Sequence, residues 1–197
     1  MRWLTRRGAA AALAVGVATL WGFGWRGFAL LLAFFVSGSL LTPETRGRRR
    51  NERQVLANGG VAALAALAGS WAAFAGALAA ATADTWASEI GRRSRTLPRL
   101  IITGRPVPAG TDGGITLLGT AGGVAGAACI AGLSLWLPAV TYSLRFGSAI
   151  ASAGIIGMLL DSVLGATVQG RTRWLDNDAV NLAATLGGAA AALVVMS

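Results

Sequence analysis

The acidic side chains are the groups of this sequence best suited to chemistry, and there are eight of them. Each lies near one end of an apolar segment, as Asp84 and Asp161 do in two separate segments. A charge in a membrane segment costs roughly 2.5 to 3.5 kcal/mol at a helix centre, so it is rarely kept without a use. We expect Asp84 and Asp161 to lie at the centre of a functional site. The alternative is that each is a buried carboxylate with purely structural hydrogen bonds.

Helical spacing sorts the neighbours of Asp84. At 100° per residue, Asp84 shares a face with Ser88, and Thr85 shares a different face with Glu89. We expect Thr85 and Ser88 to help bind substrate or nucleotide. Glu89 lies about 140° from Asp84, so we expect it to reach the site only near the end of the helix, or to pair with Arg92 or Arg93 instead.

A second stripe accompanies Asp161. Gly165 and Gln169 follow at steps of four residues, and Ser162 adjoins the carboxylate. Gly165 has no side chain to prevent a ligand or another backbone from approaching closely.

Two more segments begin with polar residues. Arg53, which we expect to help bind substrate or nucleotide, precedes Gln54 and Asn58, which face the same way. Asn181 faces the same way as Asn177. We interpret Asn58 as a site residue, whereas capping or an interhelical hydrogen bond explains Gln54 equally well. Asn181, a turn inside its segment, is placed to reach the same cavity.

A glycine-rich loop precedes one apolar segment and contains Gly110, Thr111, Asp112, Gly113 and Gly114. Successive backbone N–H groups that lead into a helix N-terminus can bind an anion, and the helix dipole adds positive potential. Flexible connectors look similar, but the polar side chains in this loop and the segment that follows it directly favour a binding role.

Composition indicates one integral membrane domain over residues 1–197. The sequence is 54% apolar, contains 28 glycines and has a mean hydropathy of +0.61. The formal charge of +9 comes from arginines that flank apolar stretches, so we interpret it as a topology and lipid-headgroup signal and expect no nucleic-acid binding. We expect no cleaved signal peptide, because tryptophans follow the first segment where small residues would be needed.

Missing residue types narrow the chemistry further. The sequence has no histidine and no lysine, and Cys129 is its one cysteine. This excludes Cys/His metal sites, histidine-based triads and Schiff-base lysine chemistry. The carboxylates, hydroxyls, amides and guanidinium groups that remain suit hard cations and phosphate.

Apolar stretches predict a polytopic all-α bundle of about seven spans, with six as the alternative if one pair is re-entrant. The ranges are 8–24, 27–41, 54–69, 71–90, 115–137, 146–168 and 178–196. A cytoplasmic N-terminus places every arginine except Arg26 and Arg145 on the cytoplasmic side, as the positive-inside rule requires. The same topology brings all eight acidic residues to that side, so we expect a site that faces the cytoplasm from the plasma membrane.

Carboxylates beside a glycine-rich loop and many arginines indicate a Mg²⁺ and phosphate site. Phosphoryl transfer to a phosphate monoester needs no histidine base, because the acceptor's second pKa is about 6 and its dianion is already nucleophilic. A lipid acceptor would explain why the site lies between membrane spans.

Four ordered motifs carry a family resemblance. They are Arg53-Gln54-Val55-Leu56-Ala57-Asn58-Gly59, Ala83-Asp84-Thr85-Trp86-Ala87-Ser88-Glu89-Ile90-Gly91, Gly110-Thr111-Asp112-Gly113-Gly114-Ile115-Thr116 with Gly119-Thr120, and Asp161-Ser162-Val163-Leu164-Gly165-Ala166-Thr167-Val168-Gln169. Over roughly residues 45 to 190 the sequence resembles the integral-membrane family of plant phytyl-phosphate kinase and animal transmembrane protein nineteen.

That resemblance implies CTP-dependent phosphorylation of an isoprenoid monophosphate, of phytyl or geranylgeranyl type, to its diphosphate. Asp84 and Asp161 would hold Mg²⁺ and the nucleotide phosphates, with Asn58, Glu89 and the Gly110 to Gly114 loop around them. A cytidylyltransferase acting on a lipid phosphate is the nearest enzymatic alternative, and an ion-coupled or small-molecule transporter or a lipid-binding scaffold are the others. Nucleoside triphosphate, prenyl monophosphate and membrane lipids are the expected partners, and the sequence leaves a homo-oligomer open.

Overall fold

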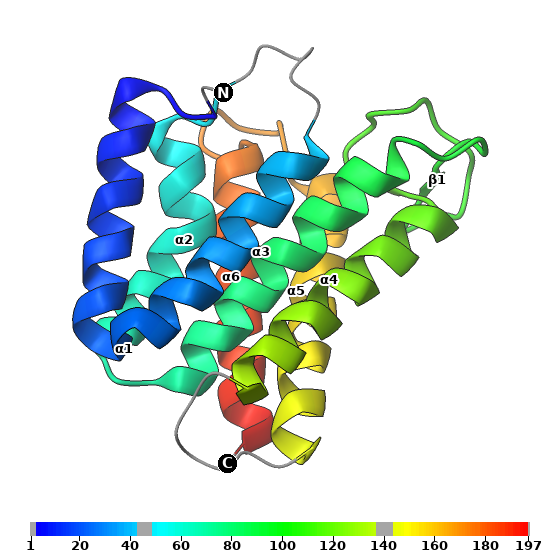
Figure 1. Ribbon diagram of the computed structural model, residues 1–197. Helices are drawn as coiled ribbons and strands as arrows, with labels where there is room; N and C mark the ends of the chain where they lie inside the picture. Colours follow the sequence, from blue (N-terminus) through cyan, green and yellow to red (C-terminus); the bar gives the residue numbers. More distant parts are fainter. Residues whose placement is uncertain (1–2, 43–48, 137–143, 197) are drawn as a thin grey trace.

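The computed structural model describes residues 3–42, 49–136 and 144–196, which form a helical bundle with one small sheet (Figure 1). The helices are α1 (Arg6–Leu41), α2 (Glu52–Leu67), α3 (Trp71–Gly91), α4 (Leu117–Trp136), α5 (Leu144–Thr167) and α6 (Asn177–Met196). Strands β1 (Arg99–Leu100) and β2 (Gly114–Ile115) pair antiparallel between α3 and α4. The all-α class agrees with the sequence prediction, whereas the short sheet was not predicted. It closes the loop that the sequence identified only as glycine-rich.

Side-chain caps fix where several helices begin. Asn51 and Gln54 form a capping box at the start of α2, which is the structural interpretation left open for Gln54. Ser70 accepts a hydrogen bond from the backbone of Ala73 at the start of α3. These caps explain why the helix starts follow the sequence signals closely.

Helix α1 reverses direction at Gly24, where φ is 61° and ψ is −156°. This backbone conformation is essentially restricted to glycine, because any Cβ would strain it. The two arms of α1 run antiparallel, as Figure 1 shows in the two blue helical stretches. Phe28 of the second arm contacts the first arm at Gly16. The predicted ranges 8–24 and 27–41 therefore correspond to the two arms of one bent element.

Helix α3 is the centre of the bundle and packs against every other helix that the structure describes. Its residues from Ala73 to Ala83 are all buried. Small residues permit the close approach: a Cβ at Gly76 would lie 2.6 Å from the backbone oxygen of Gly188 in α6. A Cβ at Gly157 in α5 would lie 2.4 Å from that of Ala80. Helix contacts of this kind stabilise membrane bundles without a hydrophobic drive between helices.

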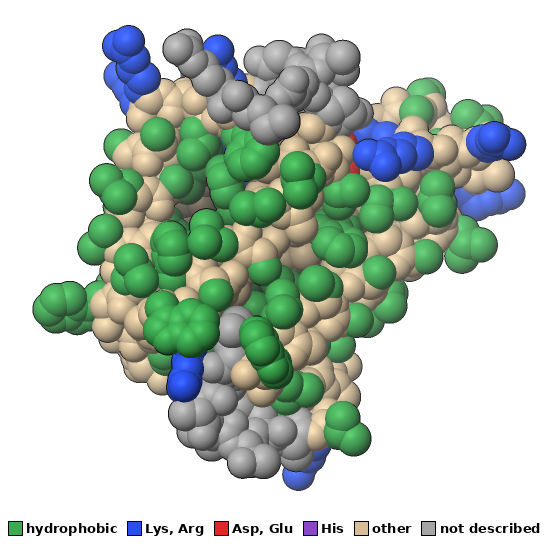
Figure 2. All heavy atoms as spheres, in the orientation of Figure 1, with side chains coloured by type: hydrophobic (Ala, Val, Ile, Leu, Met, Phe, Trp, Pro, Cys, Tyr) green, Lys and Arg blue, Asp and Glu red, His purple; other side chains and the backbone are tan. Residues whose placement is uncertain are grey.

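Four of the described helices, α1, α4, α5 and α6, are long and apolar enough to cross a membrane. Helix α2 has 16 residues, short for a span, and α3 is alanine-rich and shielded from lipid by its neighbours. The number of crossings therefore stays a prediction. Exposed large hydrophobic side chains cover much of the face in Figure 2, as expected for a surface in contact with lipid.

The bundle has an arginine-rich end, defined here as the end where α3 and α5 finish and α2, α4 and α6 begin (Figure 1). The segments that link these helices carry most of the arginines. Arg26 follows the reversal of α1, and Arg145 lies in the first turn of α5, both toward the opposite end. Arg2, Glu44, Arg46 and Arg48 lie outside the described residues.

Candidate phosphate and metal site

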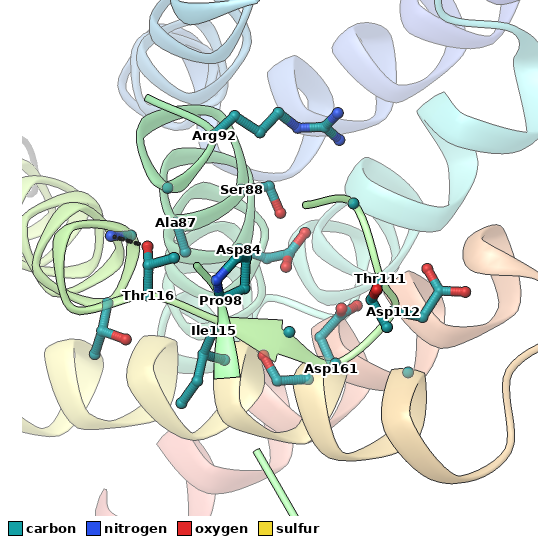
Figure 3. Close-up of a pocket in the computed structure, with 18 of the residues that line it drawn as sticks. Asp84, Ala87, Ser88, Arg92, Pro98, Thr111, Asp112, Ile115, Thr116 and Asp161 are labelled. Carbon is teal, nitrogen blue, oxygen red and sulfur yellow. Dashed lines mark hydrogen bonds between the residues drawn. The ribbon is translucent and has the colours of Figure 1, made fainter. Parts of the chain in front are cut away.

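A cavity of about 190 Å³ opens at the arginine-rich end between α3, α4, α5 and the 92–116 link (Figure 3). It contains most of the residues that the sequence predicted. They are Asp84, Ser88, Gly110, Thr111, Asp112, Gly113, Gly114, Asp161, Ser162, Gly165 and Gln169. Residues from three separate motifs are therefore brought to one place by the packing of α3 against α4 and α5.

Two aspartates from different helices face each other in this cavity. Asp84 comes from α3 and Asp161 from α5, and the two carboxyl groups are close enough to interact (Figure 3). Among the described residues, Oδ2 of Asp161 is buried and has no hydrogen-bond partner. Neither aspartate has an arginine within 4 Å in the part of the chain that the structure describes. A buried pair of like groups without an ion-pair partner calls for a proton or a cation between them.

The glycine-rich loop adds a third carboxylate, because Asp112 lies close enough to act electrostatically on Asp161. The loop is held against α5 by backbone contact: a Cβ at Gly113 would lie 2.4 Å from the Cβ of Ala166. A Cβ at Gly165 would lie 3.0 Å from the backbone nitrogen of Gly113. The absence of side chains at these two glycines therefore sets the distance between the loop and the aspartate pair.

The N-terminus of α4 forms another wall of the cavity. Thr116 accepts a hydrogen bond from the backbone N–H of Gly119 at 3.0 Å, and Gly119 and Thr120 both line the space. Arg92 lines it from the end of α3. Backbone N–H groups, a helix N-terminus and a guanidinium group are the usual donors to phosphate oxygens.

Other predicted site residues lie outside this cavity. Arg53 donates to Oδ2 of Asp176 at 2.6 Å and lies 3.7 Å from Oδ2 of Asp178, so it joins the starts of α2 and α6. Asn181 lies one turn into α6 and does not line the cavity, although Asn177 does.

Thr85 and Glu89 lie on a different face of α3 from Asp84 and Ser88, as the helical spacing predicts. Thr85 lines a second, apolar cavity beside α1 and α2, and Glu89 is within electrostatic reach of Arg50. Asn58 lines the same apolar cavity and donates to the backbone oxygen of Gln54 at 3.0 Å. The structure thus places Asn58, Thr85 and Glu89 away from the aspartate pair.

Sequence reasoning missed Arg92, Ser94 and Thr96 as lining residues. Arg92 continues the stripe of Asp84 and Ser88 at steps of four, so the periodicity of α3 was a usable signal. Ser94 and Thr96 follow the helix in a turn, where no periodic pattern would have revealed them.

Among the lining residues, only aspartates belong to the residue types that commonly bind metal ions, which are His, Cys, Asp and Glu. No group of three such residues is close enough to hold a metal by itself within the described ranges. The pair of Asp84 and Asp161 nevertheless suits Mg²⁺, which is usually bound by one or two carboxylates and keeps water or phosphate oxygens in its other positions.

An apolar helical bundle with a carboxylate and glycine-loop cavity at one end defines an integral membrane protein with a polar site at one end of its helices. More particularly, the chain belongs to the family described as integral membrane protein DUF92, which matches residues 1–189.

The chain is similar to three proteins of known sequence in particular. An uncharacterised membrane protein of Methanocaldococcus jannaschii is 36% identical, with 95% of this chain and 83% of the relative covered. Protein PGR of Arabidopsis thaliana is 34% identical over 74% of this chain and 65% of its own length. The chloroplastic protein VTE6 of the same plant is 28% identical over 91% of this chain and 61% of its own length. No solved structure matches the chain.

Proposed function

We propose that this protein is a membrane-bound kinase for an isoprenoid monophosphate, which it converts to the diphosphate with a nucleoside triphosphate, CTP being favoured. The observation that carries the proposal is the buried pair of Asp84 and Asp161, with an unpartnered Oδ2 on Asp161 among the described residues. The resemblance of the four motifs to the phytyl-phosphate kinase family supports the same reaction.

Mg²⁺ would be held by Asp84 and Asp161 and would neutralise charge on the phosphates that it contacts. The fit rests on the donor set, because two carboxylates leave most positions of an octahedral ion to phosphate and water oxygens. Asp112 adds negative charge at the same place.

The nucleotide phosphates would lie against the Gly110–Gly114 loop, the N-terminus of α4 and Arg92. These groups supply hydrogen bonds or positive charge to the phosphates. They take no part in proton transfer. They would hold the transferred group in line between the acceptor and leaving oxygens, and such positioning is the main contribution of protein to phosphoryl transfer.

The reaction requires no general base. An oxygen of the acceptor monophosphate forms a bond to the γ-phosphorus, and the bond from that phosphorus to the β-bridging oxygen breaks. The nucleoside diphosphate leaves with the electron pair of that bond. The acceptor's second pKa is about 6, so its dianion predominates near neutral pH. A chain without histidine or lysine can therefore support this chemistry.

The site would face the cytoplasm from the plasma membrane. The cavity lies at the arginine-rich end, and cytoplasmic ends of membrane proteins collect arginine. Beyond the aspartate, the buried residues of α3 are alanine, glycine, leucine and phenylalanine, with Thr82 as the one hydroxyl between Ala73 and Ala83. This argues against a polar path through the bundle such as a transporter needs.

A direct test incubates purified protein with geranylgeranyl or phytyl monophosphate, Mg²⁺ and each nucleoside triphosphate in turn, and identifies the products by mass. The proposal predicts prenyl diphosphate and nucleoside diphosphate, with CTP the best donor. A CDP-linked lipid with pyrophosphate would replace the proposal by cytidylyl transfer. Folded protein that gives no product with any triphosphate would reject both enzymatic accounts.

A further inference from the structure

A second cavity, of about 320 Å³, lies between the two arms of α1, the start of α2 and one face of α3. Its volume falls within the roughly 300–1,000 Å³ of typical small-molecule sites. Most of its wall is leucine, valine, phenylalanine and alanine from α1. Four polar residues gather near the arginine-rich end of this wall: Arg50, Gln54, Asn58 and Thr85.

Arg50 is fixed at that end by its backbone. Its N–H donates to the oxygen of Trp3 at 3.0 Å, and its oxygen accepts from the N–H of Thr5 at 3.1 Å. Its guanidinium carbon lies 5.5 Å from the centroid of the Phe35 ring, which lines the same cavity. The side chain therefore points inward and does not extend into solvent.

The guanidinium also approaches the two neighbouring helices. A Cβ at Gly38 would lie 3.0 Å from Nη2 of Arg50 and 3.1 Å from Cγ2 of Thr85. Burial lowers the pKa of Arg50, although nearby Glu89 opposes this. A partly desolvated guanidinium binds phosphate or carboxylate oxygens more strongly than one in water.

The cavity is elongated and opens toward lipid. Its wall on the first arm of α1 runs from Ala12 to Leu20, which is about 12 Å at 1.5 Å per residue. Leu13, Val17 and Leu20 belong to this wall and are also exposed. The hydrophobic surface in Figure 2 includes the face of α1, so an apolar chain can enter from the bilayer without crossing a polar surface.

We propose that this cavity binds the hydrocarbon chain of the lipid monophosphate, with the phosphate directed toward Arg50. Thr85 follows Asp84 directly in α3, so the polar end of the cavity and the aspartate pair lie at the same depth on faces about 100° apart. This assignment rests on the proposed function for the identity of the lipid and adds the place where the lipid binds.

The test measures binding of geranylgeranyl monophosphate to the purified full chain without nucleotide or metal, by native mass spectrometry from detergent. Ala12→Phe fills the cavity, and Ala14→Phe is the matched control, because Ala14 is exposed on the same arm and lies outside this cavity. We expect Ala12→Phe to weaken binding at least about tenfold and Ala14→Phe to change it less than about twofold.

The phosphate end is tested separately with Arg50→Gln and its exposed neighbour variant Arg49→Gln. Loss of a charge-assisted pair should weaken binding of the monophosphate about tenfold in Arg50→Gln and leave binding of geranylgeraniol, which has no phosphate, unchanged. Arg49→Gln should bind both lipids as the wild type does. Phosphatidylglycerol serves as the competitor for an ordinary membrane lipid, and equal retention of it by the wild type would overturn the assignment.

Failure of this inference differs from failure of the proposed function. If Ala12→Phe binds and phosphorylates the lipid as well as the wild type, the kinase stands and the cavity is not its chain site. If no variant or wild type turns over substrate while Ala12→Phe still loses binding selectively, the cavity binds the lipid and the kinase assignment fails.

Discussion

At the scale of single residues, Asp84 and Asp161 are two buried carboxyl groups in one cavity, and among the described residues the structure shows only the more distant Arg92 as a positive charge acting on Asp84. Ionisation of both groups at once is unfavourable unless a cation binds between them. The same pair therefore links a stability measurement to the proposed chemistry, independently of turnover.

Mg²⁺ should raise the midpoint of thermal unfolding of the wild type, because a ligand that binds only the folded state stabilises it by about 2.7 kcal/mol at a hundredfold excess over Kd. Asp161→Asn should abolish this rise and should be at least as stable as the wild type without Mg²⁺, since an amide takes the place of one carboxyl group without a second charge. Glu52→Gln is the control, because Glu52 is the first residue of α2, lies 3.7 Å from Arg7 and does not line the cavity. An undiminished Mg²⁺ effect in Asp161→Asn would remove that residue from the metal site.

A different carboxylate gives a pH prediction. The pKa of Asp176 lies below its ordinary value, because the backbone N–H of Ala179 donates to it and Arg53 pairs with it. A carboxyl group whose pKa is lower in the folded state stabilises the protein at pH above its unfolded-state pKa of about 4. That stabilisation is lost as the pH falls through the folded-state pKa. Asp176→Asn keeps the cap but not the charge, so it should be slightly less stable at neutral pH. The difference from the wild type should vanish in acid unfolding titrations; a difference that persists at low pH would contradict the ion-pair account.

At the scale of elements, the reversal of α1 depends on one glycine. Gly24→Ala should destabilise the protein by about 1–3 kcal/mol, because the required backbone conformation is strained for any residue with a Cβ. Gly132→Ala, in open space within α4, should be neutral or stabilising by up to about 1 kcal/mol. Reversible unfolding in detergent compares the two variants, and equal stability would show that the reversal imposes no strain.

Two glycine substitutions test whether the position of the glycine-rich loop matters for activity. Gly113 and Gly104 have similar positive φ angles, 73° and 68°, but only Gly113 is pressed against α5. Gly113→Ala should move the loop away from the aspartate pair and reduce kcat/KM for the nucleotide by at least about tenfold. Gly104→Ala carries the same conformational cost without the collision and should stay near the wild type. Equal losses in both variants would mean that backbone strain, and not loop position, is responsible.

At the scale of the whole molecule, topology can be tested with single cysteines in a Cys129→Ser background. Cysteines at Arg26 and Arg145 should react with an impermeant maleimide from outside the cell, and a cysteine at Arg105 should react only after the membrane is opened. Labelling of the cysteines at positions 26 and 105 from the same side would contradict the seven-span arrangement with a cytoplasmic N-terminus.

The helices could be predicted from sequence because apolar runs and capping residues are local signals. The starts and ends of α2 to α6 differ from the predicted ranges by only a few residues. The β1 and β2 pair was beyond such reasoning, since each strand has two residues and its pairing is decided by a turn.

The candidate site could be predicted only in part. Asp84 and Asp161 were identifiable because charge in an apolar segment is costly wherever the segment packs. Asn58 lies on α2, and the cavity that it lines depends on how α2 packs against its neighbouring helices. That packing is tertiary structure, which local sequence patterns do not reveal. The apolar cavity depends likewise on the reversal at Gly24, which folds one arm of α1 over the other.

The measurement that tests the central claim most directly follows the label from CTP into lipid. Wild type and Asp161→Asn are incubated with geranylgeranyl monophosphate and CTP labelled at either the γ- or the α-phosphorus. The account predicts that γ-label alone enters the lipid, as the diphosphate, and that Asp161→Asn, folded to the same degree, transfers none. Transfer of α-label to lipid, or undiminished transfer by Asp161→Asn, would contradict phosphoryl transfer at the aspartate pair.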